Sequence, residues 1–229
     1  MCGRFTLKTP AAQVKTALGL FDVPELTPRY NIAPTQSILA VRPGTEAKRE
    51  CVFLRWGLVP SWATDVKIGN QLLNARKETV ATKPSFRSAF RRQRCLIPAD
   101  GFYEWQKLGK AKQPFWIHRP DEMPFFFAGL WDRNENGEKG PLETCTIVTT
   151  EANGMIKSIH ERMPLILQPK QGDEWLDPQL ADAKWLECLA ACPDDFLVAD
   201  RVSDHVNSPR NNDCKCIEPI SPNGLFGKT

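Results

Sequence analysis

The sequence predicts an α+β fold in which mainly antiparallel strands form a barrel-like or two-sheet core with peripheral helices. Short β-branched or aromatic runs recur along the chain, bounded by Gly, Pro, Asp and Asn. Helical patterns are few, and strands and helices never alternate in the βαβ order that predicts a parallel sheet. Because the 229 residues contain no repeat and no clear linker, we expect one domain over residues 1–229.

Seven short segments carry the strand pattern, and four carry helical spacing. The expected strands are residues 37–41, 51–57, 94–105, 114–119, 124–131, 144–150 and 163–169. The expected helices are residues 11–20, a segment that starts at Pro84 with Phe86 and Phe90 as its apolar stripe, residues 151–159, and residues 173–191 with a break near Pro178. Such short strands with few helices favour the barrel-like core over a layered α/β fold.

The composition is that of an ordinary globular protein, with 41% hydrophobic and 25% charged residues. No apolar run approaches the length that crosses a bilayer, and the first residues lack the layout of a signal peptide, so we expect a cytoplasmic protein without membrane association. The eight cysteines lack framework spacing and are expected to be reduced. Cys188 and Cys192, with Cys214 and Cys216, match zinc-site spacings poorly, and "KWLECLAAC" is typical of an apolar helix face. No metal site is therefore predicted.

One segment concentrates positive charge, although the net charge of the chain is only +3. Residues 76–94 contain seven basic side chains and one acidic side chain. Within them Arg87, Arg91 and Arg94 recur at i, i+4 and i+7 beside the apolar stripe. This pattern is typical of a phosphate-binding face, and a solvated helix surface is the alternative interpretation.

The start of the chain, "MCGRF", places Cys2 directly behind the initiator methionine. Removal of Met1 would leave Cys2 with a free α-amine and a thiol two carbons apart. Cys2 alone is equally compatible with a frayed and inert terminus.

Three further polar residues stand in unusual settings. His160 lies where a helix-like segment gives way to a strand, and a histidine at such a junction can transfer protons near neutral pH. Glu104 lies between Tyr103 and Trp105, where partial desolvation would raise its pKa. Asn74 precedes Arg76 by two residues, so both side chains can emerge on one face. For each of these residues a plain surface or strand position is the alternative, and His118 and His205 are expected to be structural.

Trp62 lies in the Pro-bounded loop of "RWGLVPSWA" and is a candidate platform for stacking an unpaired base. Together with Phe86 and the arginines, it predicts contact with single-stranded nucleic acid. No motif for nucleotide hydrolysis, dinucleotide binding, zinc proteolysis or a nucleophile elbow is present, so no cofactor is expected.

Nine blocks of the sequence, in order, resemble those of the SOS-response-associated peptidase (SRAP) family. They are "MCGRFTL", "RYNIAPTQ", "RWGLVPSWA", "LLNARKET", "RCLIPADGFYEW", "PFFFAGLW", "TIVTTEAN", "IHERMPLIL" and "VNSPRNN". The resemblance implies the SRAP fold and a protein that shields abasic sites in single-stranded DNA by bonding to them covalently. It also implies removal of the chain's own Met1, which is the origin of the word peptidase.

When the family's catalytic residues are matched to this sequence by position, the resemblance implies a catalytic group of Cys2, Asn74, Glu104 and His160. It also implies DNA contacts, which we extend from Trp62 and Arg76 to the other candidates. The predicted DNA-binding residues are Arg4, Trp62, Arg76, Phe86, Arg87 and Arg162. The expected product is a thiazolidine, because the amine and thiol of one cysteine can both add to an aldehyde carbon.

Two other functions remain open from the sequence. The chain could be an N-terminal-nucleophile amidohydrolase that acts on a small substrate through Cys2, or a noncatalytic binder of single-stranded DNA. The expected partner is single-stranded DNA that contains abasic sites, bound by a monomer without a nucleotide cofactor, and the protein would then associate with the nucleoid.

Overall fold

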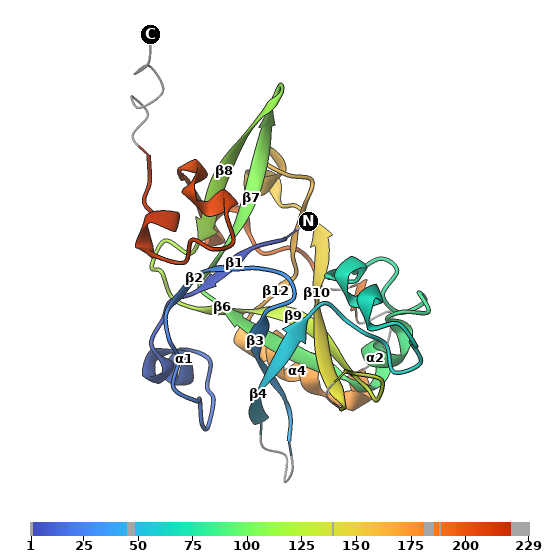
Figure 1. Cartoon of the computed structure of the whole chain (residues 1–229). Helices are drawn as coiled ribbons and strands as arrows, with labels where there is room; N and C mark the ends of the chain where they lie inside the picture. The colour runs from blue at the N-terminus through green and yellow to red at the C-terminus, as the bar shows by residue number, and fades with distance from the viewer. Residues whose placement is uncertain (1, 45–48, 139, 181–185, 188, 221–229) are drawn as a thin grey trace.

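The computed structural model describes residues 2–44, 49–138, 140–180, 186–187 and 189–220. Five long strands form the centre of the molecule (Figure 1). They are β3 (Ser37–Pro43), β4 (Arg49–Trp56), β6 (Arg94–Ala99), β9 (Phe125–Asn134) and β10 (Leu142–Glu151). Their order is β10-β4-β3-β6-β9, and β9 pairs again with β10, so the five strands close into a barrel.

The barrel is mainly antiparallel, as expected, but β10 also makes parallel pairs. It runs parallel to β4, where Thr144 faces Arg55, and parallel to β5 (Asn74–Arg76), where Ile147 faces Asn74. Two short strands extend the same sheet: β11 (Arg162–Pro164) pairs with β10, and β12 (Ile166–Leu167) pairs with β9. Strands β5 and β11 therefore both pair with the C-terminal end of β10.

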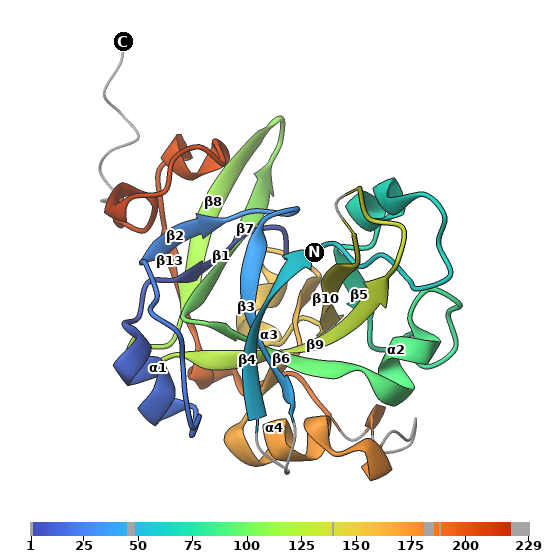
Figure 2. The ribbon, with the colours of Figure 1, turned by 60° about the horizontal axis from the view of Figure 1, so that its bottom comes forward.

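A second, antiparallel sheet covers one end of the barrel (Figures 1 and 2). In spatial order its strands are β13 (Val198–Arg201), β8 (Ala111–His118), β7 (Gly101–Leu108), β1 (Phe5–Leu7) and β2 (Arg29–Ile32). Phe5 of β1 joins the two sheets, because its ring makes edge contacts with Trp56 at 5.4 Å and with Phe127 at 5.8 Å between ring centroids. The two-sheet, barrel-like core predicted from the sequence is confirmed.

The segment 94–105, predicted as one strand, is two strands in different sheets. The break falls at Asp100, between β6 of the barrel and β7 of the second sheet. Asp100 is fully buried, and its carboxylate accepts hydrogen bonds from Thr6 Oγ1 and, on the other oxygen, from the Lys8 and Thr9 amides and from Thr9 Oγ1. Gly101 must follow, because a Cβ there would lie 2.2 Å from Nε1 of Trp116. The sequence signals a turn at Asp100-Gly101, but we expected one strand across it because both halves are apolar.

The helices are short and lie outside the barrel. They are α1 (Ala11–Ala17), α2 (Arg87–Arg92), α3 (Gly154–Lys157) and α4 (Pro169–Leu176), with 3-10 turns at Val66–Gln71, Pro178–Leu180, Asp194–Phe196, Asp204–Asn207 and Cys214–Cys216. The helix expected over 173–191 begins earlier, at Pro169, and ends before Pro178. Residues 181–185 and 188 of that prediction lie outside the described residues. No helix in the described part of the chain is long and apolar enough to cross a membrane.

Asp100 provides a test of how the two sheets are joined. Asp100→Ala removes the acceptor of two buried backbone amides and two hydroxyls, so we expect the free energy of unfolding to fall by about 2–4 kcal/mol. Urea denaturation monitored by tryptophan fluorescence measures this loss. The matched control is the exposed Asp121, where alanine is expected to change stability by less than about 1 kcal/mol. Equal effects at both positions would contradict the proposed anchoring role.

Candidate active site

Cys2 lies at the junction of the two sheets and is fully buried. Strand β1 runs antiparallel to β7, with Phe5 facing Phe102 and Thr6 facing Gly101. The pairing continues toward the terminus, because the amide of Tyr103 donates to the carbonyl of Arg4 at 3.0 Å. This register brings the first residues of the chain alongside the part of β7 that carries Glu104.

Asn74 reaches the same place from β5. Its Nδ2 donates a hydrogen bond to the carbonyl oxygen of Cys2 at 2.9 Å. Its Oδ1 is buried and has no hydrogen-bond partner among the described residues. The parallel pairing of β5 with β10 sets this position, which the sequence pattern of so short a strand could not show. Asn74 therefore fixes the backbone of Cys2 and leaves one amide oxygen as an acceptor.

Glu104 is buried beside Cys2, with 3% of its surface exposed. Burial raises the pKa of its carboxyl above the ordinary range. The pKa of the Cys2 thiol is also raised, first by its own burial and then by the nearby charge of Glu104. In the chain that retains Met1 the thiol is therefore protonated at neutral pH. Its Sγ lies 3.6 Å from the carbonyl oxygen of Arg4.

His160 completes the group from the turn that follows α3. Its Nε2 lies 4.0 Å from Oε2 of Glu104. Its Nδ1 lies 3.0 Å from the backbone nitrogen of Arg162 and 3.1 Å from the backbone oxygen of the same residue. A neutral ring can thus accept from the amide, and a protonated ring can donate to the carbonyl. The ring can change its protonation state without losing its partner, which suits proton transfer.

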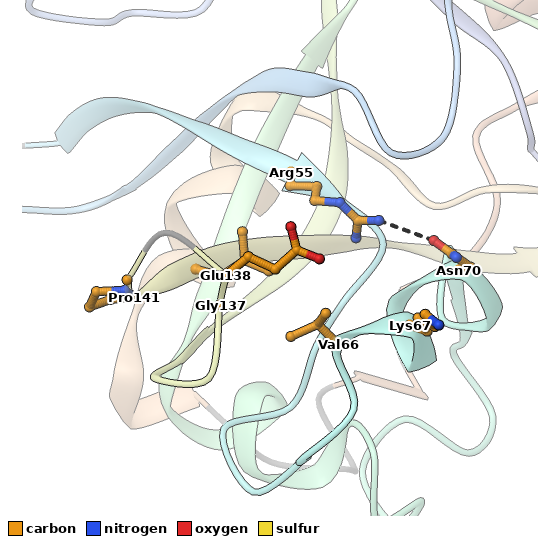
Figure 3. Close-up of a pocket in the computed structure, with 9 residues that line it drawn as sticks. Arg55, Val66, Lys67, Asn70, Gly137, Glu138 and Pro141 are labelled. Carbon is orange, nitrogen blue, oxygen red and sulfur yellow. Dashed lines mark hydrogen bonds between the residues drawn. The ribbon is translucent and has the colours of Figure 1, made fainter.

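A hollow of about 340 Å³ opens beside His160. Among its lining residues are Trp105 of β7 and Ser158 of the turn after α3. Trp105 was noted from the sequence only as a neighbour of Glu104, and alternation along the strand directs the two side chains to opposite faces. A different hollow, of about 430 Å³, lies at the start of β10, with Arg55, Asn70 and Glu138 in its wall (Figure 3). It is therefore at the opposite end of β10 from His160.

The predicted DNA-binding residues separate into two groups. Trp62 is 58% exposed, and Arg76 and Arg87 are also exposed. Phe86 is 2% exposed and belongs to the core, so it offers no face on which a base could stack. Phe86 directly precedes α2, and the expected apolar stripe of Phe86 and Phe90 is buried in the core, so the structure does not support the predicted DNA contact of Phe86.

The guanidinium groups of Arg4 and Arg162 already bond within the protein. Arg4 donates to Oδ1 of Asn31 and to the carbonyl oxygens of Val206 and Asn207. Arg162 forms a two-point ion pair with Glu78 and donates to the carbonyl of Thr149. The partners lie far away in the sequence, so the sequence could not reveal these roles.

The predicted basic face is smaller than its sequence suggests. Arg94 is buried, donates to the carbonyl of Asp177 and lies over the rings of Phe90 and Trp175. Lys77 donates to the carbonyl of Leu189. The exposed basic side chains of this segment are Arg76, Lys83, Arg87, Arg91 and Arg92. Of these, Arg76 is the one next to the site in sequence, two residues from Asn74.

The four cysteines weighed as a zinc site do not form one cluster in the described structure. Cys192 belongs to the main hydrophobic core, Cys216 belongs to a separate small core, and Cys188 lies outside the described residues. Cys214 is exposed. The interpretation of "KWLECLAAC" as an apolar segment agrees with the burial of Cys192.

Known proteins share both the sequence and the architecture of this chain. An abasic site processing protein of Bacillus subtilis, YoqW, is 43% identical over 223 residues, which cover 95% of this chain and 99% of the relative. YedK of Escherichia coli, also named an abasic site processing protein, is 32% identical over 231 residues, which cover 96% of this chain and 100% of the relative. HMCES of Gallus gallus is also named an abasic site processing protein. It is 31% identical over 266 residues, which cover 96% of this chain and 78% of the relative.

A crystal structure of a protein from Bacteroides thetaiotaomicron superimposes with a TM-score of 0.83 at 27% identity, over 96% of this chain and 100% of the other. The family model described as SOS response associated peptidase (SRAP) matches residues 1–209. Because that match covers nearly the whole chain, and relatives at 43% and 32% identity match 95% and 96% of it, this chain belongs to the SRAP family.

Proposed function

We propose that this protein shields abasic sites in single-stranded DNA by forming a covalent thiazolidine through Cys2. The observation that carries the proposal is that Cys2 is buried beside Glu104 and hydrogen-bonded to Asn74, while His160 lies 4.0 Å from Glu104. These four residues come from four separate parts of the chain. The relatives named as abasic site processing proteins support the same substrate.

The reaction requires the N-terminal amine of Cys2. While Met1 is attached, the nitrogen of Cys2 is an amide, so Met1 must first be removed, by the chain itself or by an aminopeptidase. The amine then adds to the aldehyde of the ring-opened sugar and loses water to give an imine. The thiol adds to the imine carbon, its proton passes to the nitrogen, and a five-membered ring closes. The imine is also the species from which lyase-like strand cleavage could start, and ring closure removes it.

The neighbouring residues supply proton transfer and position. Burial raises the pKa of Glu104, which suits this carboxyl to deliver a proton to the departing hydroxyl during dehydration. His160 protonates the sugar ring oxygen as the ring opens. Asn74 holds the Cys2 carbonyl, and its unpaired Oδ1 is the acceptor for the new amine.

The DNA reaches the site as a single strand. Cys2 has no exposed surface, so a sugar must leave any helical stack to meet it. Exposed Trp62 offers a stacking surface for a neighbouring base, and Arg76 lies two residues from Asn74, where it can meet a phosphate. We propose that the protein acts as a monomer in the cytoplasm, on the nucleoid, without a cofactor.

A crosslinking assay tests the proposal directly. Protein shown by mass spectrometry to lack Met1, mixed with a single-stranded oligonucleotide that contains one abasic site, is expected to give a band that survives denaturing electrophoresis. Cys2→Ala should abolish the band, whereas Cys51→Ser, at a partly exposed thiol elsewhere, should leave it unchanged. Absence of the band from Met1-free protein would favour an amidohydrolase. Protection of the DNA that persists in Cys2→Ala would favour a noncatalytic binder.

Glu104→Gln tests the proton transfer. Removing a general acid–base group is expected to slow crosslinking about 10²–10⁴-fold and to abolish the inflection in the pH–rate profile that arises from Glu104. That inflection should lie above the ordinary pKa of glutamate, because burial raises the pKa of this carboxyl. If Glu104→Gln crosslinks at the wild-type rate between pH 6 and 8, Glu104 does not transfer protons in this reaction.

The stability of the same variant separates loss of chemistry from loss of fold. Because the folded chain raises the pKa of Glu104, it binds that proton more tightly than the unfolded chain does. The stabilising contribution is present at low pH and is lost as pH rises through the raised pKa. Glu104→Gln should therefore gain stability relative to the wild type as pH rises above the ordinary pKa of glutamate, as measured by urea denaturation at each pH.

Two surface variants test the DNA path. Trp62→Ala is expected to weaken binding to an undamaged single strand by about 1–3 kcal/mol through lost stacking. Arg76→Ala should weaken binding and reduce the slope of log affinity against log salt by about one. Fluorescence anisotropy at several salt concentrations measures both effects. Lys15→Ala on α1 is the matched control. An equal loss of DNA affinity in this variant would show that the DNA does not bind preferentially at Trp62 and Arg76.

A further inference from the structure

Two 3-10 turns near the end of the described chain bring three metal-ligating side chains together. The turns, Asp204–Asn207 and Cys214–Cys216, lie beside β8 and β2 (red in Figure 1). A ring nitrogen of His205, a carboxylate oxygen of Asp213 and Sγ of Cys216 all lie within 4.8 Å of one another. This is the one such group of three or more ligands in the part of the chain that the structure describes.

The local sequence explains why two of these ligands converge. Asp213 caps the second turn, because its Oδ1 accepts from the amide of Lys215 at 3.0 Å, and Cys216 is the last residue of that turn. Asp213 and Cys216 are thus separated by two residues around one tight turn, which is the spacing found in zinc knuckles. His205 comes from the neighbouring turn, which Ser203 caps.

The chemistry of the three groups suits one class of ion. Nε2 of His205 lies 3.2 Å from both carboxylate oxygens of Asp213. Cys216 is fully buried, with Sγ 3.5 Å from the carbonyl oxygen of Asn211. A thiolate, an imidazole and a carboxylate together form a donor set typical of Zn²⁺.

We propose that His205, Asp213 and Cys216 bind a Zn²⁺ ion, with a water molecule as the fourth ligand. Binding releases the thiol proton of Cys216, and the neutral imidazole moves its proton from Nε2 to Nδ1. Asn211 now lies with Nδ2 3.1 Å from Nδ1 and 2.7 Å from the carbonyl of His205. For Oδ1 to accept the Nδ1 proton this amide must turn over and give up its hydrogen bond to the His205 carbonyl, so Asn211 lowers the affinity of the site.

The ion would stabilise the segment that supports the first strand. The carbonyl oxygen of Val206, next to His205, accepts from both Arg4 and Asn31. Asn31 is buried and also donates to the carbonyls of Ser208 and Asn211. The role is structural, and it does not depend on what Cys2 reacts with.

Titration of the metal-free, full-length protein with Co²⁺ tests the site, because a tetrahedral Co²⁺–thiolate complex has a visible and charge-transfer spectrum that excess Zn²⁺ abolishes. We expect one equivalent to bind, with affinity that increases from pH 6 to 8 as the thiol proton is displaced. Cys216→Ser and His205→Gln should weaken binding more than about tenfold.

Cys214→Ser is the matched control, since Cys214 is exposed in the same turn, and it should leave affinity and spectrum unchanged. Cys2→Ala should also leave them unchanged, which excludes the N-terminal thiol as the ligand. Thermal melting in a chelator identifies any variant that does not fold. If Cys216→Ser does not fold, the Co²⁺ affinity of His205→Gln, at a partly exposed position, tests the site instead. No thiolate spectrum, or a spectrum lost with Cys214 or Cys2, would overturn the proposal.

Discussion

The pairing of β1 with β7 is the constraint on which the rest of the site depends. A terminus normally frays, because it gains too little contact to offset the entropy of ordering it. Here Asp100 ties the amides of Lys8 and Thr9 to the point where β7 begins, and Phe5 inserts its ring against the barrel. These contacts set the register that carries Cys2 into the interior. Without them, a cysteine in second position would have no fixed relation to Glu104.

Burial has an electrostatic consequence at this junction. Before Met1 is removed, Cys2 contributes a neutral thiol and an amide to a site that already holds a carboxyl, and the pKa values of both the thiol and Glu104 are raised by burial. Under the proposed function, removal of Met1 moves the amino group of the chain to Cys2, so that amine and thiol belong to one residue. A protonated amine there favours the ionised form of Glu104, whereas the neutral amine is the nucleophile, so the reaction depends on proton transfer between these groups.

The sequence predicted the long elements well and the short ones poorly. Residues 37–41 lie in β3, and all but the first of residues 124–131 lie in β9, where burial of several apolar residues makes the pattern strong. The three-residue strands β1 and β5 were not predicted, because pairing with distant strands, and not a local sequence pattern, forms them. Cys2, Asn74, Glu104 and His160 were found as separate oddities and by resemblance, but their meeting point depends on registers between distant strands. The sequence also could not show which predicted DNA-binding side chains are free to meet DNA. Contacts with residues distant in sequence bury Phe86 and engage Arg4 and Arg162.

The internal bonds of Arg4 and Arg162 bear on how the protein would select its substrate under the proposed function. Their guanidinium groups already bond within the protein, whereas Arg76, two residues from Asn74, is exposed and is the better placed of these arginines to meet a phosphate. A phosphate contact is the same at damaged and undamaged sites, so it positions the strand without selecting the lesion. Selection then rests on the chemistry, because only the ring-opened aldehyde of an abasic sugar can react with the amine. A covalent bond that forms at the lesion does not need tight binding elsewhere along the strand.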